Sequence, residues 1–147
     1  MGTKSKGYVG NFRIEVRAIE GLILPLRTRP ILRNTAGKIL QLEKQSDLEL
    51  DVLLTTDLQI QKLNYKYLKH DYATDVMSFS QNDKKFLGDI VISVETAMRQ
   101  AQDQGHDLLT ELQYLLLHGI LHLLGYDDRN TSRRKLLRQK ERQLSPY

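Results

Sequence analysis

The amino-acid sequence predicts an α+β fold: a single domain over residues 1–147, with a small mixed sheet of about four strands packed with about five helices. Two observations carry this prediction. Segments in which apolar and polar residues alternate are interleaved with segments of helical periodicity, which is the order of a sheet covered by helices. The length, together with 40% hydrophobic and 27% charged residues, is typical of one soluble globular domain.

Four segments are predicted as strands. Residues 12–19 (FRIEVRAI) alternate apolar and charged side chains, as a half-buried strand does. Residues 48–54, 74–80 and 87–93 are short segments with strand-like composition. Because the turn sequence NDKK at 82–85 separates the last two, we expect them to pair as a hairpin.

Five segments are predicted as helices. Pro30 opens the first, which runs to about Leu42, although Gly37 within it has a low helix propensity. The expected bounds of the others are 55–70, 93–103, 108–124 and 131–144. Ser93 can cap the third helix and Thr131 or Ser132 the last, each through a side-chain oxygen.

Composition and charge restrict the function classes. The chain has no cysteine, so disulfides and thiolate metal ligands are excluded. The two ends, 1–45 and 129–147, are basic, whereas residues 46–128 carry six basic and fourteen acidic residues. This distribution suits a cation at the centre and a polyanion at the rim, or basic residues that are simply solvated. No apolar run approaches the ~20 residues of a membrane span, and we expect a cytoplasmic protein.

The segment HGILHLLGYDD at 118–128 carries the strongest chemical signal. His118 and His122 are four residues apart, so a helix places both imidazoles on one face, where they can bind one cation. Gly125 can end the helix, and the chain then turns back so that Asp128 can supply a third ligand. Three protein ligands leave a position open for water, as in catalytic zinc sites. The competing interpretation is a buried apolar helix whose histidines only fill the core.

The spacing of the two histidines also invites a comparison with metalloproteases. In the protease pattern H-E-x-x-H, the residue after the first histidine is a glutamate that acts as general base. Here that position is Gly119. Peptide hydrolysis by that mechanism has no proton acceptor in this sequence, and we rank it low.

Three segments together resemble the YbeY family of metal-dependent endoribonucleases. HGILHLLGYDD is similar to the family signature H-G-x-L-H-L-x-G-Y-D-H, residues 63–79 are similar to the family's L-N-x-x-Y-R-x-x-D-x-x-T-[DN]-V-L-S-F, and residues 87–93 to its G-D-I-x-I-S. The resemblance covers most of the chain from about residue 48. It implies a single α+β domain, a zinc-type site, and a role in ribosomal RNA processing and in ribosome assembly or quality control.

Two positions depart from the family pattern. Asp128 stands where the family has its third histidine. A carboxylate can also bind zinc. It makes the site more anionic than a third histidine would, and it favours harder metals such as Mn or Mg somewhat more. Leu68 stands where the family usually has an arginine that the resemblance associates with the substrate phosphate. Lys66 and Lys69 are neighbours in sequence but point elsewhere on a helix, so they replace the arginine poorly.

The functional prediction follows. We expect a metal-dependent single-strand endoribonuclease that matures ribosomal RNA and interacts with small-subunit components, not with a membrane. One divalent metal, expected to be Zn²⁺, is bound by His118, His122 and Asp128, which are also the catalytic residues. The expected RNA contacts are Lys66, Lys69, Arg133 and Arg134. The alternatives are a ribosome-associated RNA-binding or assembly factor with weak or no nuclease activity, and, ranked lower, a hydrolase of some small substrate.

Several further residues have two interpretations. Asp127 matches an aspartate of the family and either supports the metal or caps the turn. Ser78 either faces the cleft or is an ordinary strand residue, and Ser93 is more easily explained as a helix cap than as a site residue. His70 and His106 are expected at the surface.

Overall fold

The computed structural model describes residues 7–145 and contains one mixed five-stranded sheet. The strands are β1 (Tyr8–Val9), β2 (Phe12–Ala18), β3 (Glu49–Thr55), β4 (Val76–Ser80) and β5 (Phe86–Ser93). Their order in the sheet is β1-β2-β3-β5-β4. Strands β2, β3 and β5 are parallel, and β1 and β4 pair antiparallel at the two edges. The four predicted strands and the β4–β5 hairpin are confirmed; the two-residue β1 was not predicted.

Five helices complete the described part of the chain. They are α2 (Thr28–Leu42), α3 (Asp57–Leu68), α4 (Val94–Gln104), α5 (Leu108–Leu123) and α6 (Thr131–Leu144). Ser93 caps α4 as predicted, by accepting a hydrogen bond from the Thr96 backbone N–H. The predicted cap of α6 is wrong by one or two residues, because the side chain of Asn130 accepts from the Arg133 N–H at 2.9 Å. Within residues 7–145, none of the helices has the length and apolarity that crossing a bilayer requires.

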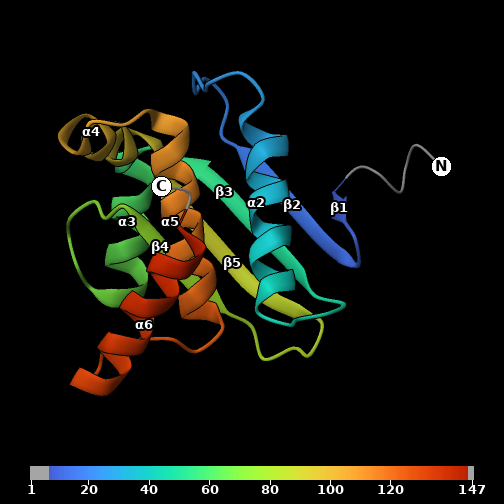
Figure 1. Ribbon diagram of the computed structural model, residues 1–147. Coiled ribbons are helices and arrows are strands. Elements are labelled where there is room, and N and C mark those ends of the chain that lie inside the picture. The colour runs from blue at the N-terminus through green and yellow to red at the C-terminus, as the bar shows by residue number, and fades with distance from the viewer. Residues whose placement is uncertain (1–6, 146–147) are drawn as a thin grey trace.

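Helices α2 and α5 cover one face of the sheet, and α3 lies on the other side (Figure 1). The main core is formed between that sheet face and α2 and α5, where Ile14, Leu50, Ile90, Leu116 and Ile120 are fully buried. Each such side chain stabilises the fold by roughly 1.5–3 kcal/mol through burial. Because α5 carries the two histidines of interest, this core fixes the position of the candidate site.

Gly37 lies inside α2, and close packing explains why glycine is tolerated there. A Cβ atom at this position would lie 2.5 Å from Cγ1 of Val9 on β1. The low helix propensity that weakened the sequence prediction is therefore compensated by the close approach of the edge hairpin. At Gly37 the close packing against Val9 outweighs the low helix propensity of glycine.

His106 is a correction to the sequence prediction. It was expected at the surface, but its side chain is only 17% exposed and its Nε2 lies 2.6 Å from Oε1 of Glu111. Glu111 is almost fully buried at 4% exposure. A buried carboxylate needs a hydrogen-bonding partner, and the histidine at the start of α5 provides one.

Candidate metal centre

Helix α5 places His118 and His122 side by side on its face toward the cleft. Their Nε2 atoms are 3.1 Å apart and their ring centroids 4.6 Å apart. The helix begins at the cap Asp107, whose side chain accepts from the Thr110 N–H, and its apolar residues pack into the core on the other faces. The i, i+4 geometry predicted from the sequence is therefore confirmed.

The end of α5 turns the chain toward Asp128. Gly125 has φ +99°, its N–H donates to the carbonyl of His122, and the Tyr126 N–H donates to the carbonyl of Leu121. This pair of bonds is the Schellman arrangement, in which a residue with positive φ ends the helix. The predicted role of Gly125 is confirmed.

Glu141 of α6 contacts Nδ1 of His118, the ring nitrogen that does not face His122. Its Oε1 lies 2.8 Å from Nδ1 of His118, and its Oε2 accepts a hydrogen bond from the Tyr114 hydroxyl at 3.3 Å. A carboxylate at Nδ1 fixes the proton there and leaves the lone pair of Nε2 free to bind a metal. Sequence reasoning missed Glu141; its only signal was that it is the one acidic residue in a basic helix.

The neutral form of the His122 imidazole is favoured. Burial and the neighbouring His118 lower the pKa of its imidazole, while Asp128, Glu141 and Asp127 partly offset this shift. The neutral imidazole is the form that binds metals.

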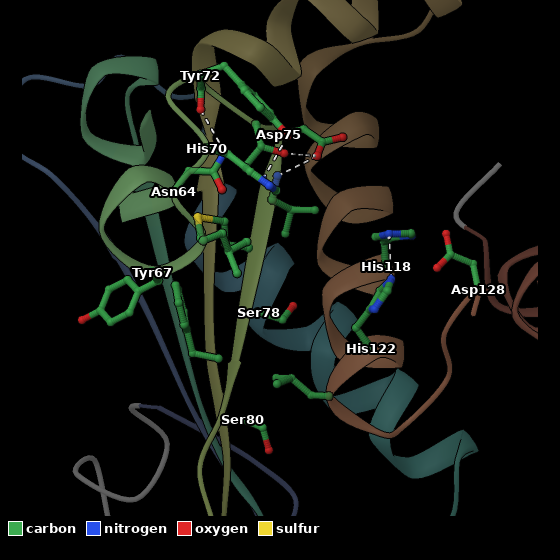
Figure 2. Close-up of a pocket in the computed structure, with 16 residues that line it drawn as sticks. Asn64, Tyr67, His70, Tyr72, Asp75, Ser78, Ser80, His118, His122 and Asp128 are labelled. Carbon is green, nitrogen blue, oxygen red and sulfur yellow. Dashed lines mark hydrogen bonds between the residues drawn. The ribbon is translucent and has the colours of Figure 1, made fainter. Parts of the chain in front are cut away.

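The histidine pair fits a divalent metal. Two nitrogens bound to one tetrahedral zinc at about 2.0–2.1 Å are roughly 3.3 Å apart, close to the observed 3.1 Å between the two Nε2 atoms. Asp128 lines the same cleft, and Figure 2 shows its carboxylate beside the pair. Across residues 7–145, no three His, Asp or Glu side chains already form a metal-binding group. The role of Asp128 as third ligand stays a prediction.

Asp127 serves the turn rather than the metal. Its carboxylate accepts from Arg129 Nε at 2.8 Å and from an Arg133 guanidinium nitrogen at 2.9 Å, and it also accepts from the Arg129 backbone N–H. These contacts, those of Arg129 first, lower the pKa of Asp127 to about 2. So weak a base is a poor proton acceptor, and Asp127 is best described as the residue that ties the loop to α6.

The histidines open into a cleft of about 660 Å³. It is bordered by β4, by the segment after α3, by α5 and by Asp128 (Figure 2). Ser78 of β4 lines it and donates to the Gly119 carbonyl at 3.2 Å, so the cleft-facing interpretation of Ser78 is confirmed. A Cβ at Gly119 would lie 3.0 Å from Cγ2 of Ile90, which shows that this position faces the sheet.

The four residues predicted to contact RNA lie in different surroundings in the structure, and none of them lines the cleft. Leu68 lines the cleft, whereas Lys66 and Lys69 do not; their ammonium groups lie over tyrosine rings at 5.3 and 5.6 Å from the centroids. Arg133 is half exposed and paired with Asp127, and Arg134 is exposed on α6. His70 is exposed as expected, but it also lines the cleft, which the sequence did not indicate.

A second cluster anchors the loop that carries Asp128. The Tyr126 hydroxyl donates to Oε1 of Glu43 at 2.6 Å, and Lys140 of α6 donates to Oε2 at 3.0 Å. The Glu43 side chain is only 7% exposed. These two hydrogen bonds join the end of α2, the loop and α6.

Comparison with known proteins identifies the family. A family model described as Endoribonuclease YbeY matches residues 27–146. The chain belongs to the YbeY family. Endoribonuclease YbeY of Heliobacterium modesticaldum is 42% identical over 113 residues, which are 67% of this chain and 68% of that protein. Endoribonuclease YbeY of Geobacter metallireducens is 40% identical over 124 residues, which are 78% and 83% of the two chains.

A solved structure has a similar fold. The solution structure of a Thermotoga maritima protein has a TM-score of 0.65 and covers 89% of this chain and 85% of its own. The two sequences are 23% identical. The α+β fold predicted from the sequence is confirmed by this likeness as well as by the topology.

The contact between Glu141 and His118 leads to a testable expectation for this YbeY-family site. Glu141→Ala should weaken Zn²⁺ binding by roughly 10- to 100-fold, because the histidine loses the partner that orients its ring. The Kd is measured by competition with a chromophoric chelator. Gln139→Ala, at an exposed position of the same helix, is the matched control. Equal Kd values for the two variants would contradict a positioning role of Glu141.

Proposed function

We propose that this protein is a metal-dependent endoribonuclease that cuts single-stranded RNA, with one divalent metal, Zn²⁺, held by His118, His122 and Asp128. The observation that supports the metal is the convergence of the two Nε2 atoms at 3.1 Å, with Glu141 behind His118. Membership of a family described as endoribonucleases supports RNA as the substrate.

The protein's own residues have distinct roles in this proposal. When bound, the metal supplies Lewis-acid activation of water and neutralises charge at a phosphoryl group. His118 and His122 present neutral nitrogens to it, and Glu141 keeps the proton of His118 on Nδ1. Asp128 contributes a negative charge where a third histidine would be neutral, which makes the site more receptive to harder metals.

The proposed cellular role is maturation of ribosomal RNA and ribosome quality control in the cytoplasm, together with small-subunit components. The family resemblance of the three motifs supports it. A further support is the surface of α6, where Arg134, Arg138 and Arg142 are exposed and follow one another at four-residue intervals along one stripe. Such a stripe suits the phosphates of a long RNA, and it lies on the helix that also carries Glu141.

The alternative of an RNA-binding factor with weak or no nuclease activity depends on Leu68 and Asp128. The curated relatives named above are both endoribonucleases by name, which favours the enzyme. The two functions differ in turnover: the alternative predicts RNA binding that weakens with salt, without cleavage even in saturating metal.

Metal removal tests the proposed function. We expect the chelator-treated protein to lose cleavage of a single-stranded RNA oligonucleotide, and stoichiometric Zn²⁺ or Mn²⁺ to restore it. Cleavage products are resolved by gel electrophoresis, and metal content is measured on the same samples by mass spectrometry. Unchanged cleavage by metal-free protein would refute the metal-dependent mechanism, and absence of cleavage in saturating metal would favour the binding factor.

A further inference from the structure

Large apolar side chains stay exposed along one border of the cleft. Tyr67, Leu68 and Tyr72 line it with 55%, 56% and 56% of their surface exposed, and His70 between them is exposed as well. We call these four residues the cleft wall. Contiguous exposed apolar side chains on a folded domain mark a binding surface more often than chance. The wall therefore indicates a ligand with apolar or aromatic parts.

The cleft offers little positive charge to a ligand. Among the described residues that line it there are two aspartates but no lysine or arginine. Lys66 and Lys69 belong to the same segment as the wall, yet their ammonium groups lie over the rings of Tyr67 and Tyr65. Because no lysine or arginine of the described residues lines the cleft and the ammonium group of Lys66 lies over the Tyr67 ring, contacts with the bases are expected to contribute much of the affinity for a nucleic acid.

Two rings of the wall stack on each other, which holds both in place and leaves their outer faces for a ligand. The rings of His70 and Tyr72 are stacked at 5.4 Å with an interplanar angle of 10°, and the Tyr72 hydroxyl lies 3.2 Å from Nδ1 of His70. Asn64, which is 2% exposed, donates to the Tyr72 carbonyl at 3.0 Å and so fixes this segment on the protein. A surface ordered in advance binds with a smaller entropic cost. Figure 2 shows these two residues at one end of the cleft that also holds His118 and His122.

We propose that the cleft wall stacks unpaired nucleobases of an RNA strand and thereby selects single-stranded over double-stranded substrate. The proposal rests on the proposed function and assigns the substrate-binding part of the same cleft. Every base has a π face, so stacking on tyrosine and histidine tolerates any sequence. A base inside a duplex is already stacked between its neighbours and cannot offer that face. The RNA strand continues from the wall across the cleft to the histidine pair.

The test measures binding without cleavage. In a His122→Ala background, fluorescence anisotropy gives the Kd for a single-stranded RNA oligonucleotide, for the same strand with abasic sites in its centre, and for a duplex. Tyr72→Ala should raise the single-strand Kd roughly five- to hundredfold, and Tyr72→Phe should leave it nearly unchanged. Tyr65→Ala is the control, because Tyr65 lies on α3, is 54% exposed like Tyr72, and does not line the cleft.

The abasic strand separates base stacking from backbone binding. The protein with an intact wall should bind it about as weakly as Tyr72→Ala binds the normal strand, a comparison that does not depend on the folding of any wall variant. Equal affinity of the intact wall for normal and abasic strands, or an equal loss on both in Tyr72→Ala, would overturn the proposal. Failure of the proposed function is seen separately, as absence of cleavage by metal-loaded protein with both histidines intact.

Discussion

His122→Ala is expected to reduce metal content to background and to lower RNA cleavage by a hundredfold or more. Loss of an outer partner of a ligating histidine alone costs roughly 10- to 100-fold, and loss of the ligand itself costs at least as much. The substitution removes one of the two nitrogens that converge at 3.1 Å and leaves only His118 and Asp128 of the three proposed ligands. Metal content by mass spectrometry and initial cleavage rates of an RNA oligonucleotide check both parts.

The control for this variant is another histidine. His106→Gln retains a hydrogen-bond donor for the buried Glu111 and lies outside the cleft, so metal content and cleavage should equal those of the parent protein. Thermal melting should show that both variants keep the fold, because the His122 side chain faces the open cleft and its loss removes no core contact. Parent-level cleavage by a metal-free His122→Ala protein would exclude the histidine pair as the centre of the reaction.

Gly88→Ala is expected to destabilise the protein by about 3 kcal/mol, because two unfavourable effects coincide at this residue. Gly88 has φ +153°, a conformation that residues with a Cβ rarely adopt. A Cβ there would also overlap the carbonyl oxygen of Phe79 on β4 and lie 2.9 Å from Cδ2 of Leu123. The midpoint of thermal unfolding should fall by on the order of 10 °C. Chemical denaturation measures the free energy of unfolding directly.

A second glycine separates the two effects. Gly105 also has a positive φ, +75°, but no atom lies within 4 Å of the position of its Cβ. Gly105→Ala should therefore cost only about 1 kcal/mol, the contribution of the backbone conformation alone. If the two variants lose the same free energy of unfolding, close packing of Leu123 and Phe79 on Gly88 is not the reason for the glycine. Because Leu123 follows His122, the Gly88 variant should also bind metal more weakly.

Sequence reasoning located the centre of the site because its geometry is local. Two histidines four residues apart lie on one helix face whatever the rest of the chain does, and Gly125 ends the helix through bonds to residues within one turn. The alternation of β2 and the capping of α4 by Ser93 are predictable for the same reason. Each of these features depends on interactions between residues at most a few positions apart.

The partners of those residues were not predictable in the same way. Glu141 reaches His118 from 23 positions away along the chain, and nothing in the spacing of α6 indicates which of its faces is turned inward. The sequence left two roles open for Asp127, support of a metal or stabilisation of the turn. Its hydrogen bonds from Arg129 and Arg133 show that it stabilises the turn. His70 was assigned to the surface because its segment is polar, yet the packing of that segment against β4 makes it part of the cleft.

The sequence by itself determined the fold class, the family, and the pair of histidines, since periodicity, caps and i, i+4 spacing act over one or two turns of the chain. The tertiary structure decided which residues support and surround that pair. It placed Glu141 against Nδ1 of His118, paired Asp127 with Arg129 and Arg133, and brought Tyr67, His70 and Tyr72 to the cleft that the histidines line. The physical reason is that these contacts join elements far apart in sequence, so they are set by the packing of α3, β4 and α6 around the core helix α5 and not by local propensity.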